Sequence, residues 1–327
     1  MNVQLDSHAE TEKNAADLFR SDVLNGLQST PKKLSSKYFY DKTGDHLFQK
    51  IMAMPAYYLT RCELDIFQNK TDELIELLIP GNESFDLIEL GAGDAMKSTY
   101  LLERLTSKGV DFTYMPIDIS GNILSILHEK LSNRLPDMKI TCLEGDYFEM
   151  LQKAAALSNR RKVVLFLGSN IGNMTLEEAE DFCVHLNKSL SSKDRVLVGF
   201  DLKKNPHTIL NAYNDEEGIT AAFNLNLLSR INNELGGNFD LKQFQHYQTY
   251  DPVFGACRSF LVSLISQQVT IGNTRISFEE NELIDMEISQ KFSPEKIREL
   301  SEKSGFSITG EIRDSKKWFV DVIWQVQ

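Results

Sequence analysis

The middle of the chain alternates between short apolar runs and amphipathic segments. Five apolar runs have the length of strands, at 85–90, 112–120, 138–148, 162–173 and 195–202. Three segments between them repeat apolar residues at helical spacing, at 97–108, 122–135 and 176–190. Strands that alternate with helices in this way are typical of an α/β protein with a doubly wound, mostly parallel sheet.

The two ends of this alternation predict a second lobe and a closing hairpin. After the fifth run, residues 204–235 are predicted to be helical, and residues 238–291 to form strands and turns. A helix at 294–304 and strands at 306–312 and 318–326 then predict an antiparallel hairpin that closes the main sheet. Because 327 residues exceed what one core usually supports, we expect two domains. Their predicted ranges are 64–200 plus 290–327 for the sheet domain, and 10–63 plus 201–289 for an α+β lobe over its strand ends.

Composition and charge narrow the class of protein. The chain is 42% hydrophobic and 25% charged, as an ordinary globular protein is. Its net charge of -12 disfavours nucleic-acid binding, because a phosphate backbone requires a cationic face. No apolar run approaches the roughly 18 residues of a membrane span, and the first thirty residues lack the apolar core of a signal peptide. We therefore expect a cytoplasmic protein that binds neither nucleic acid nor membrane. Its four cysteines form no CxxC pair, so we expect no metal.

The strongest local motif is Glu89-Leu-Gly-Ala-Gly93, directly after the first apolar run. Ligands of open parallel sheets bind beyond the carboxyl ends of the strands, where a chain needs small residues to approach them. Gly91 and Gly93 supply that access, and Glu89 is an acid at the strand end. This motif by itself is also common in plain strand–helix turns.

Two further acidic positions follow neighbouring strands. Asp118 ends the second strand, where a carboxylate can accept hydrogen bonds from both ribose hydroxyls. Asp146 follows the third strand and can accept the adenine amino group, with Tyr147 beside it to cover the ring. Together with the glycine turn, these positions predict a site for an adenosyl ligand.

The choice between adenosyl ligands depends on the third glycine of the dinucleotide fingerprint. That fingerprint requires G-x-G-x-x-G to bind a pyrophosphate, and here Met96 stands at its third glycine. S-adenosylmethionine has no phosphate, and its sulfonium and amino-acid tail suit acidic and carbonyl groups. The sequence therefore favours S-adenosylmethionine over NAD.

The chain also resembles a known family along most of its length. The shared motifs, in order, are Tyr40-Asp41-x-x-Gly44, Pro55-x-Tyr57-Tyr58-x-Thr60-Arg61-x-Glu63, ELGAGDAMKS, MPIDIS, GDY, FLGSNIGN and MEISQKF. They are similar to those of the histidine-specific N-α-methyltransferases of ergothioneine biosynthesis. The resemblance implies a Rossmann-like class I methyltransferase sheet with a second α+β substrate-binding lobe. It also implies N-methylation of a free amino acid, with L-histidine converted to trimethylhistidine (hercynine).

The resemblance assigns roles to individual residues. By the resemblance, the positions that match those holding S-adenosylmethionine are Gly91, Lys97, Asp118, Asp146 and Tyr147. Glu89 and Gly93 are expected cofactor residues from the motif above. The positions that match the amino-acid site are Tyr40, Tyr57, Gly168, Asn173, Tyr213, Glu287 and Ser289. By that analogy Asn173 and the Gly168 carbonyl orient the α-amine, with Tyr40 close by.

The remaining roles concern the two ends of the substrate. Tyr57 and Tyr213 are expected to bind the carboxylate, and Glu287 and Ser289 the imidazole. A single carboxylate beside a hydroxyl suits a ring with two nitrogens. The catalytic residues by this resemblance are Tyr40 and Asn173.

One position leaves the side-chain specificity open. Ser259 stands where members of the family often place a methionine against the imidazole. A tryptophan-like or other amino acid is therefore an alternative substrate. A protein that binds S-adenosylmethionine without turnover is a second alternative, and the oligomeric state is left open. A methyltransferase of proteins or nucleic acids is disfavoured by the acidic charge and the second lobe.

Overall fold

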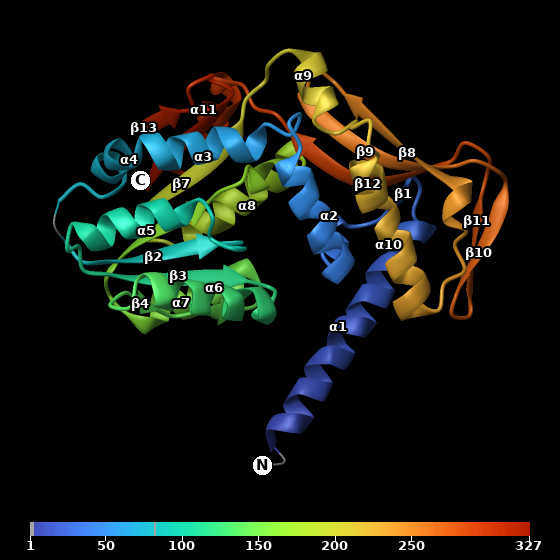
Figure 1. Cartoon of the computed structure of the whole chain (residues 1–327), viewed down its shortest axis with the longest axis horizontal. Helices are drawn as coiled ribbons and strands as arrows, with labels where there is room; N and C mark the ends of the chain where they lie inside the picture. Colours follow the sequence, from blue (N-terminus) through green and yellow to red (C-terminus); the bar gives the residue numbers. More distant parts are fainter. Residues whose placement is uncertain (1–2, 82) are drawn as a thin grey trace. The chain divides into compact units, whose positions relative to one another are not determined.

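The computed structural model describes residues 3–81 and 83–327, with side chains from residue 16 onward (Figure 1). The chain divides into two compact units. Unit 1 comprises Met1–Tyr58 and Asn205–Ser289, and unit 2 comprises Leu59–Lys204 and Gln290–Gln327. That unit 2 holds the cofactor and unit 1 the substrate stays a prediction.

Unit 2 is built on an eight-stranded sheet, in the order β13-β14-β7-β6-β2-β3-β4, with β5 also paired to β3. The strands are β2 (Phe85–Leu90), β3 (Phe112–Asp118), β4 (Lys139–Ile140), β5 (Leu143–Glu144), β6 (Arg161–Phe166), β7 (Arg195–Asp201), β13 (Phe306–Arg313) and β14 (Phe319–Val326). Strand β2 pairs in parallel with β3 and β6, and β6 with β7. Strand β14 runs antiparallel to both β7 and β13. The predicted α/β class and its closing hairpin are confirmed.

The third predicted strand, 138–148, differs from the prediction. It consists of the two-residue pieces β4 and β5, and helix α7 begins already at Tyr147. Gly145 adopts a φ of +148°, which leaves the strand geometry. The Asp146 carboxylate then accepts the backbone N–H groups of Phe148 and Glu149, which starts the helix.

The helices of unit 2 are α3 (Leu59–Asn69), α4 (Thr71–Leu78), α5 (Ser98–Ser107), α6 (Gly121–Arg134), α7 (Tyr147–Leu157), α8 (Leu176–Lys188) and α11 (Pro294–Lys303). The starts of α6, α7, α8 and α11 follow from side-chain caps, because the first N–H groups of a helix need acceptors. Ser120 caps α6, and Thr175 and Glu178 form a reciprocal capping box at the start of α8. In Figure 1 the strands β2 and β3 lie between α5 on one side and α7 on the other.

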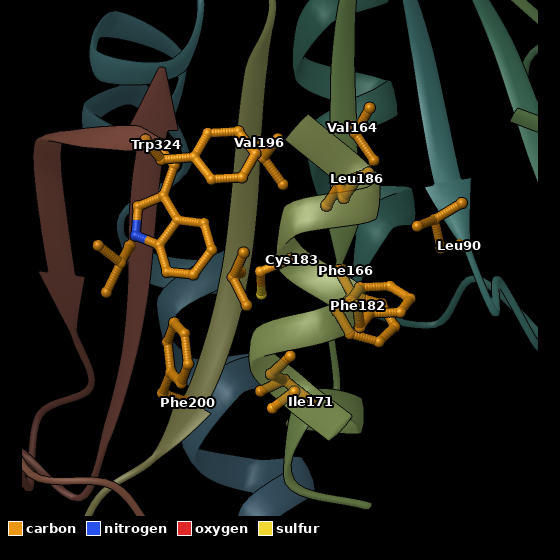
Figure 2. Close-up of a cluster of buried hydrophobic side chains, with 14 of the residues drawn as sticks. Leu90, Val164, Phe166, Ile171, Phe182, Cys183, Leu186, Val196, Phe200 and Trp324 are labelled. Carbon is orange, nitrogen blue, oxygen red and sulfur yellow. The ribbon is translucent and has the colours of Figure 1, made fainter. Parts of the chain in front are cut away.

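One face of the sheet packs against α7, α8 and α11. The strands contribute side chains such as Leu90, Val164 and Phe166, which lie opposite Phe182 and Leu186 of α8 (Figure 2). All five are at most 7% exposed. Burial of this continuous apolar layer supplies the main stabilising free energy of the unit, and it holds the strand ends in place.

Unit 1 combines helices with two small sheets. Its helices are α1 (Val3–Gln28), η1 (Ser36–Phe39), α2 (Lys42–Ala53), α9 (Pro206–Asn211), α10 (Ile219–Leu235) and η3 (Leu241–Gln243). Its strands are β1 (Lys32–Lys33), β8 (Phe244–Tyr250), β9 (Ala256–Ser263), β10 (Gln267–Ile271), β11 (Thr274–Phe278) and β12 (Leu283–Gln290), which ends just inside unit 2. The sheet orders are β1-β12-β9-β8 and β10-β11. Buried residues of α1, α10 and both sheets share one core.

The predicted helical stretch 204–235 is interrupted between α9 and α10. The Asp215 carboxylate accepts the backbone N–H groups of Ile219 and Thr220, and Gly218 has a φ of +70°. A new helix therefore starts there, and the intervening loop carries Tyr213. Within the described residues, none of the helices has the length and apolarity that a membrane span requires.

Candidate active site

The tip of β2 turns sharply through two glycines with positive φ, +69° at Gly91 and +53° at Gly93. The two differ in the space around them. A Cβ atom at Gly91 would lie 2.7 Å from the hydroxyl oxygen of Tyr147, whereas one at Gly93 would meet no atom within 4 Å. The backbone is therefore closely covered at Gly91 and open at Gly93.

Asp118 lies beside this open turn at the end of β3. Its Oδ2 accepts the backbone N–H of Gly93 at 3.1 Å, and its Oδ1 accepts that of Ser120 at 3.0 Å. The carboxylate thus joins the tips of two neighbouring strands, and each oxygen retains a lone pair for a ligand hydroxyl. The next residue, Ile119, is 63% exposed, and sequence reasoning missed this large apolar side chain next to the site.

Asp146 and Tyr147 lie at the start of α7. Asp146 uses Oδ1 to cap the helix, accepting the N–H of Phe148 at 2.9 Å. The ring of Tyr147 packs edge-on against Phe166, with 6.0 Å between centroids. Burial raises the pKa of Tyr147 to about 12, so its hydroxyl over Gly91 stays protonated at neutral pH.

Glu89 is buried within β2, just before the glycine turn. The side chain is 4% exposed and accepts a hydrogen bond of 2.5 Å from the Tyr114 hydroxyl. Burial raises the pKa of Glu89 to about 7, partly offset by the hydroxyls of Tyr114 and Ser98 and by the charge of Lys97. Its role toward the cofactor stays a prediction.

The segment after β6 forms the third tip of the sheet. Gly168 and Ser169 have φ values of +77° and +56°, and a 3-10 helix, η2 (Asn170–Asn173), follows. The predicted substrate residue Asn173 ends this helix with an exposed side chain. The geometry thus places Gly168 and Asn173 on one short turn.

Lys97, Gly168 and Asn170 lie together near Gly91. A Cβ atom at Gly168 would lie 3.4 Å from both the Lys97 Nζ and the Asn170 Oδ1, and one at Gly91 would lie 3.3 Å from the Asn170 Nδ2. The ammonium of Lys97 bonds to the carboxylate of Glu63. Asn170 and Glu63 were not among the predicted site residues. Asn170 belongs to the shared motif FLGSNIGN, and Glu63 to the motif that starts at Pro55.

In unit 1 the structure joins three of the predicted substrate residues. The rings of Tyr57 and Tyr213 lie edge to face, with 6.1 Å between centroids. The hydroxyls of Tyr213 and Ser289 share a hydrogen bond of 2.7 Å. Glu287 precedes Ser289 by two residues on β12 and is half-buried.

Tyr40 lies directly after η1, also in unit 1. It is 41% exposed and packs edge-on against Phe48 and Phe223. The next residue, Asp41, caps α2 by accepting the N–H of Gly44 at 2.7 Å, as expected for a structural role. Ser259, the position that departs from the family pattern, is 3% exposed and opposite Gln248 in the β8–β9 register.

The sheet and its tips define the class of the protein. A parallel sheet closed by an antiparallel strand, with a glycine turn after β2 and acids after β3 and β5, is typical of S-adenosylmethionine-dependent methyltransferases. A family model described as "Histidine-specific methyltransferase, SAM-dependent" matches residues 19–326. The chain belongs to this family, as the sequence motifs predicted.

Three relatives illustrate the range of the similarity. Histidine N-alpha-methyltransferase of Mycolicibacterium smegmatis is 34% identical over 87% of this chain and 87% of its own length. Ergothioneine biosynthesis protein 1 of Schizosaccharomyces pombe is 28% identical over 85% of this chain, but over 37% of its own length. The 4-dimethylallyltryptophan N-methyltransferase easF of Claviceps fusiformis is 28% identical over 60% of this chain and 57% of its own length.

The open space at Gly93 yields a first test. Gly93→Ala places a methyl group in that space, and Gly109→Ala is its matched control, with a φ of +67° and no atom within 4 Å. Each variant loses about 1 kcal/mol of stability, because an L residue is strained at positive φ. We expect only Gly93→Ala to weaken S-adenosylmethionine binding in titration calorimetry. Equal affinities for the two variants would exclude the Gly93 turn from the cofactor site.

The buried carboxyl of Glu89 yields a second test. Its folded pKa of about 7 lies above the ordinary value of 4.5, so the folded state binds the proton more tightly. The free energy of unfolding therefore falls as pH rises from 4.5 to about 7, by about 3 kcal/mol in total. Denaturant unfolding across this range is expected to show that fall for the wild type relative to Glu89→Gln. A constant difference between them would contradict the raised pKa.

Proposed function

We propose that this protein transfers methyl groups from S-adenosylmethionine to the α-amino nitrogen of free L-histidine, up to the trimethylated product hercynine. The observation that carries this proposal is the histidine-specific family match over residues 19–326. The relatives named for histidine methylation and for ergothioneine biosynthesis support the same substrate and pathway.

The strand tips of unit 2 fit the adenosyl co-substrate. The open space at Gly93 admits a ligand against the backbone, and the Asp118 oxygens beside it suit two ribose hydroxyls. We assign the adenine ring of S-adenosylmethionine to Asp146 and Tyr147, and its amino-acid tail to Lys97. Gly91 and Glu89 complete the proposed cofactor residues. When bound, S-adenosylmethionine supplies an electrophilic methyl group on a sulfonium.

The proposed substrate residues of unit 1 are neutral hydroxyls with one carboxylate. Tyr57 and Tyr213 are assigned to the substrate carboxylate, and Glu287 and Ser289 to the imidazole. The hydrogen bond between Tyr213 and Ser289 supports placing the two subsites side by side, because it links one residue of each. Hydroxyl donors can hold a carboxylate, although each bond is weaker than one from an arginine.

The α-amine must lose its proton before it can accept a methyl group. We assign its orientation to Asn173 and the Gly168 carbonyl, with Tyr40 as the third residue. Neutral acceptors and phenols favour the uncharged amine, because desolvation disfavours the ammonium form. Methyl transfer is a displacement in line with the breaking bond, so correct placement of the amine supplies most of the catalysis.

A tryptophan-like substrate is the second candidate, supported by the Claviceps relative and by Ser259 in place of a methionine. Histidine is favoured because the relative named for it is more similar and matches a larger share of this chain. Mass spectrometry of products from all twenty amino acids with S-adenosylmethionine tests both substrates. We expect mass gains of one to three methyl groups on histidine. Methylation of tryptophan alone would replace the proposal, and no methylated product would leave only a binding protein.

Two variants separate the proposed subsites. Glu287→Ala removes the imidazole carboxylate and is expected to raise the KM for histidine on the order of tenfold or more, since a bond to a charged group is lost. Its affinity for S-adenosylmethionine stays unchanged. Asp118→Asn is expected to weaken S-adenosylmethionine binding and to leave the KM for histidine unchanged. Steady-state kinetics and calorimetry measure both, and parallel loss of both affinities in Glu287→Ala would assign this residue to folding.

A further inference from the structure

Below the Gly168 turn, unit 2 contains a group of buried ionisable side chains, only two of which have a role in the proposed function. We name Glu63, Glu89, Asp321 and Lys97 the carboxyl cluster. Glu63 and Asp321 are fully buried, Glu89 is 4% exposed, and the Lys97 side chain is 20% exposed. Three buried acids therefore lie close enough to the Lys97 ammonium to feel its charge, and Glu63 pairs with it.

Glu63 is the member with the most contacts to the site. Its two carboxylate oxygens both accept the backbone N–H of Gly168 at 2.9 Å, and one also bonds to the ammonium of Lys97. One side chain of α3 thus holds both the third strand tip and the first residue before α5. Contacts to two separate segments mean that a change at Glu63 is transmitted to both.

The sheet is shaped to admit this carboxylate. A Cβ atom at Gly199, in the interior of β7, would collide with the Oε1 of Glu63. Glycine weakens a strand interior and often marks a close approach of another group. Asp321 lies opposite Gly199 in the β7–β14 register. The strands below Glu63 therefore provide both space and a second acid.

The acids of the carboxyl cluster differ in their hydrogen-bond partners and in their pKa values. Neither carboxylate oxygen of Asp321 has a hydrogen-bond partner in the part of the chain that the structure describes, and an unpaired buried carboxylate is costly. Burial, together with the charge of Glu63, raises the pKa of Asp321 well above its ordinary value. Burial also raises the pKa of Glu89 to about 7. The ammonium of Lys97 pairs directly with Glu63.

We propose that Glu63 is a positioning residue for methyl transfer, whose carboxylate holds the Gly168 peptide and the Lys97 ammonium together. The inference rests on the proposed function, in which Lys97 binds the co-substrate and the Gly168 carbonyl orients the α-amine. Glu63 touches neither ligand in this scheme. It acts by fixing the two groups that do.

Glu63→Gln tests the proposal. The amide keeps only one of the two carboxylate oxygens that accept from Gly168, and its NH₂ group faces the donors of Gly168 and Lys97. We expect the dissociation constant for S-adenosylmethionine to rise and kcat to fall, each on the order of tenfold, because bonds to charged groups are lost. The KM for histidine stays unchanged, since its carboxylate and imidazole are assigned to unit 1. Calorimetry and steady-state kinetics on the full chain measure these values.

A double-mutant cycle with Lys97→Met separates the two routes. In the Lys97→Met background, Glu63→Gln is expected to cause no further loss of S-adenosylmethionine affinity, because the ammonium is already gone. It still lowers kcat through Gly168. Additive losses of affinity would contradict the link between Glu63 and Lys97.

Asp86→Asn is the matched control. Asp86 and Lys162 form a second buried pair, at 2.7 Å, at the opposite ends of β2 and β6. Their variant removes a comparable ion pair and is expected to lower stability with kcat unchanged for the folded fraction. If Glu63→Gln also lowers only the stability and leaves kcat unchanged, Glu63 has a merely structural role, and the proposal is overturned. Asp321→Asn, a neutral isostere of the protonated acid, is expected to fold and keep kcat within about twofold. A loss as large as that of Glu63→Gln would contradict the raised pKa of Asp321.

The remaining outcomes are also decisive. If Glu63→Gln does not fold, Lys97→Gln replaces it, and wild-type affinity for S-adenosylmethionine in Lys97→Gln overturns the proposal. If the wild type methylates histidine but Glu63→Gln matches it in every constant, the inference fails and the proposed function stands. If the wild type methylates no amino acid, the proposed function fails, and the double-mutant cycle on S-adenosylmethionine affinity still judges the link between Glu63 and Lys97.

Discussion

Parallel pairing of β2 with β3 and β6 brings the carboxyl ends of three strands to one edge of the sheet in unit 2. Each strand must there leave the sheet in a turn whose backbone stays accessible. Positive φ values at Gly91 and Gly93 provide the turn after β2, and one at Gly168 provides the turn after β6. The Asp118 carboxylate joins the tips of β2 and β3. The adenosyl site proposed for this edge depends on that pairing.

Buried ion pairs occur at both ends of this sheet, and their surroundings distinguish them. The Asp86–Lys162 pair lies where β2 and β6 begin, and the Ser158 hydroxyl and carbonyl satisfy its remaining bonds. The Glu63–Lys97 pair lies where the strands end and also accepts the Gly168 amide. A buried pair alone is weak evidence for function. Its attachment to a strand tip is the feature that connects Glu63 with the proposed chemistry.

Unit 1 offers a different chemistry from unit 2. Tyr57, Tyr213 and Ser289 form a connected set of neutral hydroxyl-bearing side chains, and Glu287 adds one carboxylate on the same strand as Ser289. Such a set can bind a zwitterion without a strong positive charge. A neutral environment also favours the deprotonated amine that methyl transfer requires.

Much of the fold could be read from the sequence, because periodic burial leaves a periodic pattern. The apolar runs at 85–90 and 195–202 gave strands within a residue of β2 and β7, and the helix–strand–strand ending gave the closing hairpin. The third strand, predicted at 138–148, was predicted too long. Gly145 and the cap by Asp146 end the strand and start a helix, although the surrounding apolar pattern continues. The same kind of local cap, from Asp215, divided the predicted helix at 204–235.

The sequence by itself determined the family, the glycine turn and the acids of the strand ends, because these depend on residue types at short, ordered spacings. Only the tertiary structure showed that Glu63 bonds Gly168 and Lys97, that Gly199 makes room for it, and that Tyr213 reaches Ser289. The two bonds of Glu63 alone join residues that are 34 and 105 positions apart. No local pattern encodes such pairs, since the sheet register and the packing of α3 bring them together.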